Sequence, residues 1–189
     1  NCALRHFKLK PMFRHGFFGW ILMKAYKYRF GLKRDLEKKK NNQIFLPTLS
    51  QLNDPCEGAF HDQITLDKSG FLHPYIKQQF QKFYDGNAKR GIYSLSKIPN
   101  HELMWAYYAN SHAGFCIEYD LDELEKIDDF MCKFDIQYCP SVPEVCFTTV
   151  FVNNSIEKIL KFTVGSKSES WAHEQELRLV TDSNGLKYI

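Results

Sequence analysis

The stretch that decides the fold lies near the end of this 189-residue chain: residues 174–181 are Glu-Gln-Glu-Leu-Arg-Leu-Val-Thr. Leu177 and Leu179 alternate with Arg178, and a period of two is characteristic of a β-strand with two different faces. The same period places Glu174 and Glu176 on one face, where the strand opens. We therefore predict a strand that carries two neighbouring carboxylates at its start.

Outward from this strand, apolar periodicity and turn residues predict further short elements. Strands are expected at residues 20–29, 43–46, 91–96, 115–119 and 131–138. Helices are expected at 32–40, at 74–84, from a cap at Asn100 to about 112–114, at 121–129 (an acidic helix or turn), and from a cap at Asn153 or Asn154 to 162. Residues 53–55 are expected to form a turn and 165–170 a polar loop.

These elements follow one another without a regular βαβ rhythm, which favours an α+β fold. We predict a mixed, mostly antiparallel sheet, with allowance for a split between its strands, and several short helices. A single α+β domain is expected at residues 26–189, with allowance for a C-terminal truncation, after a basic and aromatic N-terminal segment at residues 1–25. The content of 44% hydrophobic and 15% aromatic residues excludes a disordered chain.

The chain is predicted to have no transmembrane helix, since its most apolar early stretch, residues 17–25, is far shorter than the ~20 residues that a span needs. That stretch also lacks the small-residue cleavage site of a signal peptide. Six cysteines without a CxxC pair are typical of reduced thiols. Zinc binding by Cys132, Cys139 and Cys146 with a His is an alternative. We expect a cytoplasmic protein with no membrane partner and no metal.

The formal net charge of +3 conceals an uneven distribution. Residues 1–40 carry a net charge of +10, and the rest of the chain carries −7. The basic residues Lys33, Arg34, Lys38, Lys39 and Lys40 fall within one predicted helix. A basic end beside an acidic body indicates an anionic partner, either an anionic cofactor or a nucleic acid, although a solvated face gives the same pattern.

Four segments together resemble a known bacterial family. They are Tyr26-Lys27-Tyr28-Arg29, Asn53-Asp54-Pro55 with Glu57, Leu103–Tyr108 leading to His112-Ala113-Gly114, and Trp171 with Glu174, Glu176 and Arg178. In order and spacing they are similar to the family known as domain of unknown function 2971, over about residues 26 to 180. Cys56 departs from the large apolar residue that is usual there. The resemblance implies relatedness to uncharacterised bacterial proteins and brings no established chemistry with it.

The order of motifs is also similar, at a lower level, to ADP-ribosyltransferases of the Arg-Ser-Glu type. That resemblance implies that Arg29 holds a phosphate of NAD and that Ser94 or Ser96 orients the nicotinamide ribose. It implies that Glu176 is the essential carboxylate and that Glu174 helps to activate an acceptor. NAD is then a co-substrate and the acceptor an unknown macromolecule. Such activities often serve toxins or phage defence.

The physical chemistry supports these roles. Cleavage of the bond between nicotinamide and ribose builds positive charge on the sugar, and a fixed carboxylate opposite that charge stabilises the transition state. A planar guanidinium can bind pyrophosphate through two parallel hydrogen bonds. Ser-x-Ser and Glu-x-Glu pairs are also common in ordinary surface strands, where cross-strand ion pairs contribute little.

An aromatic set accompanies these residues. Trp105 and Tyr108 lie three residues apart on one face of a predicted helix. Together with Tyr28 and with His112 at the helix end, they are candidates for a surface on which nicotinamide stacks. Packing of a buried helix is the plainer interpretation of the same pattern.

Two alternative functions stay open at this point. One is a non-catalytic module that binds nucleic acid or protein through the basic helix. The other is a metal-dependent nuclease in which Asp54, Glu174 and Glu176 surround a divalent ion beside Lys167. Phosphate-binding loops of the Walker and dinucleotide types, and a nucleophile elbow, do not occur in the sequence.

Overall fold

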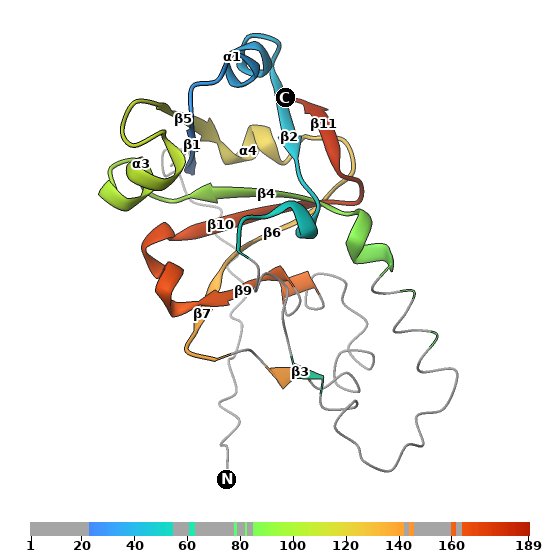
Figure 1. The fold of residues 1–189 in the computed structure, drawn as a ribbon. Helices are drawn as coiled ribbons and strands as arrows, with labels where there is room; N and C mark the ends of the chain where they lie inside the picture. Colours follow the sequence, from blue (N-terminus) through green and yellow to red (C-terminus); the bar gives the residue numbers. More distant parts are fainter. Residues whose placement is uncertain are drawn as a thin grey trace, which may run out of the picture.

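The structure is a computed structural model that describes residues 23–54, 85–141 and 164–189 and, between them, residues 61–62, 78, 82, 144–145 and 160–161 (Figure 1). The predicted helices at 74–84 and 153–162 lie mostly outside these residues, as do most of the N-terminal segment and the stretch from Pro55 to Glu57. In the part of the chain that is described, no helix is long and apolar enough to cross a membrane.

A five-stranded sheet forms the centre of the molecule. Its strands are β1 (Lys24–Arg29), β4 (Gly91–Ser96), β5 (Phe115–Asp120), β6 (Phe130–Asp135) and β10 (Glu176–Thr181). They lie in the order β5-β1-β4-β10-β6, and every neighbouring pair is antiparallel. The predicted α+β class is confirmed, and the predicted strand at 174–181 provides the sheet with a strand that is paired on both sides.

The sheet is split between β1 and β4. These strands pair only at Tyr26 and Ser96, whereas β1 pairs with β5 along its whole length and β4 pairs with β10 along its whole length. Beyond that single pair the two strands diverge, and side chains from both faces of the sheet reach the gap. This divergence positions the site described below.

Smaller elements cover both faces of the sheet (Figure 1). They include the helices α1 (Lys33–Lys40), α3 (Glu102–Tyr108) and α4 (Leu121–Leu124) and the 3-10 helices η1 (Leu49–Gln51) and η2 (Glu169–Glu174). The short strands are β2 (Gln43–Leu46), β3 (His61–Asp62), β7 (Gln137–Cys139), β8 (Glu144–Val145), β9 (Ser166–Ser168) and β11 (Gly185–Tyr188). β11 pairs antiparallel with β2, while β3 pairs with β8 and β7 with β9 in parallel.

The core lies in separate layers on the two faces of the sheet. One layer joins Leu95, Leu177 and Leu179 of the sheet to β2 and to the region of α4. A second layer joins Ile92 and Val180 to a group that includes Val164. A third, smaller cluster packs α3 against Tyr28 and is described with the site.

Several predicted boundaries are wrong. Most of the predicted polar loop at 165–170 is β9 and the start of η2, because the buried Lys167 finds its partners inside the protein. The strand predicted at 131–138 is two strands, since the backbone N–H of Ile136 donates to Glu176 and the chain then pairs with β9 instead of β10.

The remaining differences concern the ends of elements. The N-cap of α3 is His101 instead of Asn100, and the helix ends at Tyr108. Residues 85–89 are helical, so Asp85 does not close the preceding helix. β11 follows the strand that the pattern predicts to be the final one.

Candidate functional site

A cavity of about 410 Å³ lies where β1 and β4 diverge. Its walls come from β1, the segment between β1 and α1, the first turn of α1, residues on either side of η1, β4, α3, β9, η2 and the start of β10. This volume is within the range of small-molecule sites, roughly 300–1,000 Å³. The split in the sheet therefore creates a pocket whose walls belong to segments far apart in the sequence.

Most of the residues predicted to form a site line this cavity. They are Tyr28, Arg29, Ser94, Ser96, Tyr108, Glu174 and Glu176. The three elements that carry the proposed Arg, Ser and Glu set thus converge on one space. Their convergence is a property of the fold, and their chemical roles stay predictions.

Trp105 and His112 are not among the residues that line the cavity. The Trp105 indole N–H donates to the carbonyl oxygen of Pro99 at 2.9 Å, and its ring meets the Tyr28 ring edge-on, with centroids 5.4 Å apart. Trp105 therefore packs behind Tyr28, as the plainer interpretation of the aromatic set expects. His112 is exposed in the turn after α3.

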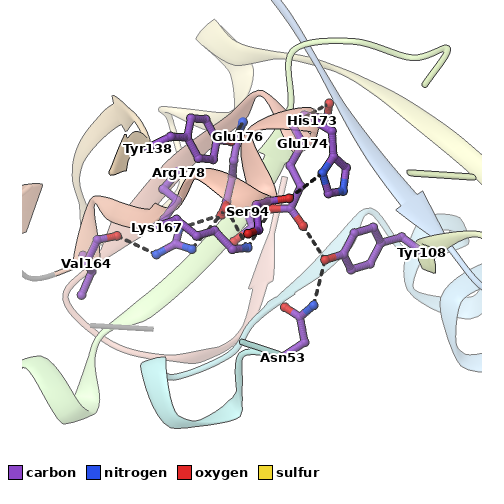
Figure 2. Close-up of polar contacts among 12 residues, drawn as sticks. Asn53, Ser94, Tyr108, Tyr138, Val164, Lys167, His173, Glu174, Glu176 and Arg178 are labelled. Carbon is purple, nitrogen blue, oxygen red and sulfur yellow. Dashed lines mark hydrogen bonds and ion pairs between the residues drawn. The ribbon is translucent and has the colours of Figure 1, made fainter. Parts of the chain in front are cut away.

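Two carboxylates and two cations form a buried network at one wall (Figure 2). The Lys167 ammonium donates to Glu174 Oε2 at 2.7 Å and lies 3.5 Å from Glu176 Oε2. The Tyr108 hydroxyl donates to Glu174 Oε1 at 2.5 Å, and the Asn53 amide donates to that hydroxyl at 2.8 Å. The hydrogen bonds of Asn53, Tyr108 and Lys167 thus all lead to the Glu174 carboxylate.

Arg178 binds the carboxylate of Glu176 through its guanidinium group. The guanidinium donates from Nε to Glu176 Oε1 at 2.6 Å and from Nη2 to Oε2 at 3.2 Å, and its Nη1 donates to the Val164 carbonyl oxygen at 2.6 Å. Although burial alone would raise the pKa of Glu176, the charge and hydrogen bonds of Arg178, with Lys167 and Ser94, lower it to about 2. Glu176 is therefore ionised throughout the neutral range.

The backbone between the two carboxylates differs from the predicted strand. Gln175 has a left-handed conformation with φ of 42°, so Glu174 ends η2 and only Glu176 begins β10. Ser96 fixes this corner because its hydroxyl donates to the carbonyl oxygen of Glu174 at 2.8 Å. The two carboxylates share one partner, Lys167, although they do not share a strand.

The position of Arg29 depends on Gly114. A Cβ atom at Gly114 would lie 2.1 Å from the carbonyl oxygen of Arg29, which no side chain can do without moving the backbone. The end of β1 and the start of β5 approach closely for this reason. Arg29 also lies near the Tyr93 hydroxyl on the apolar face of the sheet, where its charge opposes the rise that burial causes in the pKa of Tyr93.

Sequence reasoning missed Lys27, which lines the cavity between Tyr26 and Tyr28. Its ammonium donates at 2.5 Å to the carbonyl oxygen of Ser94, a strand acceptor that the divergence of β1 leaves free. Burial, followed by the charge of Arg29, lowers the pKa of Lys27 to about 7, against the opposing effect of the two carboxylates. A lysine between aromatic residues of an inner strand is the signal that could have identified it.

The charges of the cavity are distributed unevenly. Around Glu174 and Glu176, the cations Lys167 and Arg178 balance the two carboxylates. The rest of the lining carries three cations, Lys27, Arg29 and Arg34, and one acid, Asp35. Among the described residues no group of three or more His, Cys, Asp or Glu side chains is placed to hold a metal ion, and Lys167 occupies the space between the two carboxylates.

Comparison with families of known sequence gives one result. Residues 104–179 match the model of the family described as protein of unknown function DUF2971. The resemblance to DUF2971 is confirmed for this part of the chain, which runs from α3 to the middle of β10 and includes both carboxylates. No curated protein and no solved structure matches the chain.

Proposed function

We propose that the cavity binds NAD and that the chain is an ADP-ribosyltransferase-like enzyme. The observation that carries this proposal is the convergence of Arg29 from β1, Ser94 and Ser96 from β4, and Glu176 from β10 on one cavity. The three strands that carry these motifs are neighbours in the order β1-β4-β10, although the motifs lie far apart in the sequence.

The division of charge in the cavity agrees with a dinucleotide. Arg29 and Arg34 provide guanidinium groups for the two phosphates, which are the anionic part of NAD. The carboxylates of Glu174 and Glu176 line the same cavity, and we assign them to the ribose next to nicotinamide, which would develop positive charge. Tyr28 supplies an aromatic wall, and Trp105 supports it from behind.

The reaction requires charge stabilisation more than proton transfer. The bond between ribose C1′ and the nicotinamide nitrogen breaks, and its electron pair leaves with neutral nicotinamide. A nucleophilic O–H or N–H group of the acceptor bonds to C1′ and releases its proton. Glu176 is ionised and held rigidly by Arg178. Its negative charge stabilises the positive charge that forms on the sugar while one bond breaks and the other forms.

The release of nicotinamide from NAD by the full chain tests the proposal. Glu176→Gln removes the charge but keeps the shape, so we expect turnover to fall about 100-fold or more. Glu118→Gln is the matched control, because Glu118 is an exposed carboxylate on β5 that pairs with Lys24 outside the cavity. Equal turnover by Glu176→Gln and the control would refute the assignment.

A binding measurement keeps the proposal testable if Glu176→Gln folds poorly. Arg29→Gln leaves the carboxylate network intact, and the loss of a guanidinium–phosphate contact is expected to weaken NAD binding about 10-fold or more. Isothermal titration calorimetry with NAD measures this directly. If wild-type protein does not bind NAD at millimolar concentration, the proposal is wrong.

A further inference from the structure

The helix α1 presents a cationic surface. It has no buried side chain, and its last turn consists of Lys38, Lys39 and Lys40. The two acids of the helix do little to balance this charge. Asp35 accepts a hydrogen bond from the backbone N–H of Leu32 at the N-terminus, and Glu37 lies 3.8 Å from Lys33 in an exposed pair.

The cations of this region repel one another. The pKa of Lys38 is lowered by burial and then by the charges of Arg29 and Arg34, with only Asp35 acting in the opposite direction. Arg29 lowers the pKa of Lys27 in the same way. A set of cations that depress one another's protonation gains free energy when a polyanion lies across them.

The charge continues from α1 into the cavity. Arg34 belongs to the first turn of α1 and also lines the cavity, as Arg29 does at the end of β1. A chain of phosphates lying along α1 would therefore end at the mouth of the site.

Exposed apolar rings lie beside the lysines. Phe45 of β2 is directly opposite Leu186 of β11, and both side chains are exposed, as is Tyr188 at 71%. The ammonium of Lys38 lies 4.7 Å from the centre of the Phe45 ring, so the basic and apolar surfaces are continuous. Figure 1 shows α1, β2 and β11 grouped at one end of the molecule.

We propose that α1 and the exposed face of β2 and β11 bind single-stranded nucleic acid and that this strand is the acceptor presented to the cavity. Lysines that contact phosphates, next to exposed rings on which bases stack, are the combination that binds unpaired strands without sequence preference. The acceptor role rests on the proposed function, whereas the binding of the strand does not.

The test is the salt dependence of binding to a fluorescein-labelled oligothymidylate, followed by fluorescence anisotropy with the full chain. Replacing Lys38, Lys39 and Lys40 by Gln is expected to weaken binding roughly 10-fold or more at low salt. The slope of log affinity against log salt concentration should fall by about 2, since each phosphate contact on a single strand contributes about 0.7. These side chains are surface groups of a helix without buried residues, so the fold should persist.

A charge-matched control removes Lys82, Lys89 and Lys161, which are exposed and lie outside α1. An equal loss of affinity in this control, or no loss in the α1 variant, would overturn the proposal. Tyr188→Ala is expected to weaken binding about five- to 100-fold through lost base stacking. A duplex bound as tightly as the single strand, with no effect of Tyr188→Ala, would overturn the choice of a single-stranded partner.

The result is separable from the proposed function. Binding of the oligonucleotide without NAD turnover would retain the α1 surface and reject the enzyme. NAD turnover without binding of the oligonucleotide would retain the enzyme and reject the α1 surface as the acceptor site.

Discussion

The two faces of β10 differ sharply although they belong to one strand. Leu177 and Leu179 point into an apolar layer with β2 and the region of α4. Glu176 and Arg178 point to the other face, where both are as well buried as the leucines, at 4% and 0% exposure. Burial is thus equal on the two faces, and only the chemistry differs.

The difference shows where this chain departs from what stability alone would select. Burying a leucine contributes about 1.5–3 kcal/mol to the free energy of folding. Buried ion pairs lose much of their attraction to desolvation, and apolar replacements are often neutral or stabilising by about 1–4 kcal/mol. The apolar face therefore supports the fold, whereas the other face, which also carries the buried Val180, brings Glu176 to the lining of the cavity.

The first prediction concerns the loss of Arg178 from the charged side of β10. Arg178→Met leaves the Glu176 carboxylate buried without its main partner and the Val164 carbonyl oxygen without a donor. We expect the free energy of unfolding to fall by about 3–5 kcal/mol, as measured by urea denaturation.

The matched change on the apolar face is Leu179→Ala, which is expected to cost about 2–5 kcal/mol through a cavity. The double variant Glu176→Leu/Arg178→Met replaces the pair by apolar groups and should recover most of the stability lost in Arg178→Met. A double variant that is no more stable than Arg178→Met would show that the polar face also serves the fold.

The second prediction concerns the Tyr108 hydroxyl, at the edge of the charged network. Tyr108→Phe removes the hydroxyl that donates to Glu174 and accepts from Asn53, while the ring remains. A hydrogen bond to a charged group is worth about 1.5–3 kcal/mol, and the loss in urea denaturation should fall in this range. The control is Tyr107→Phe, since Tyr107 lies on the same helix but is 55% exposed. Equal effects of the two variants would contradict the role of the Tyr108 hydroxyl.

The apolar face was the easier one to predict from sequence. Alternation of Leu177 and Leu179 with polar neighbours identifies a strand because side-chain direction alternates with every residue. The bounds of β4 and β2 follow from the same local rule, and both match the predicted ranges. Resemblance to a family added the order of the motifs, and thereby the residues that converge on the cavity.

The polar face could be predicted only in part. Its geometry depends on Lys167, which comes from a segment predicted to be a loop and is buried by partners that the local sequence does not reveal. The left-handed Gln175 likewise follows from the bond between Ser96 and the backbone of Glu174, a contact between segments far apart in sequence. Lys27 was missed because its environment arises from the split between β1 and β4, which depends on pairing of whole strands.

The last prediction concerns Lys27, the charged residue at the split in the sheet, and its effect depends on pH. In the folded protein the pKa of Lys27 is about 7, against 10.5 for an unperturbed lysine. Between these values the unfolded chain binds more protons than the folded protein, so Lys27 makes the free energy of unfolding rise with pH. A single group can contribute no more than about 1.4 kcal/mol per pH unit, and a half-buried lysine should contribute less.

Lys27→Met removes this contribution, so its stability relative to wild type should be highest near pH 6 and should decline toward pH 9, above the folded pKa of about 7. Urea denaturation of both proteins across this range gives the difference directly, and other titrating groups cancel because both proteins contain them. The charge of Arg29 adds to the effect of burial and lowers the pKa of Lys27, whereas the charges of Glu176 and Glu174 raise it. Arg29→Gln in the wild-type background should therefore lessen the pH dependence. Parallel stability curves for wild type and Lys27→Met would show that the ammonium is as well solvated in the cavity as in water, and that the split in the sheet admits more solvent than the buried network beside it.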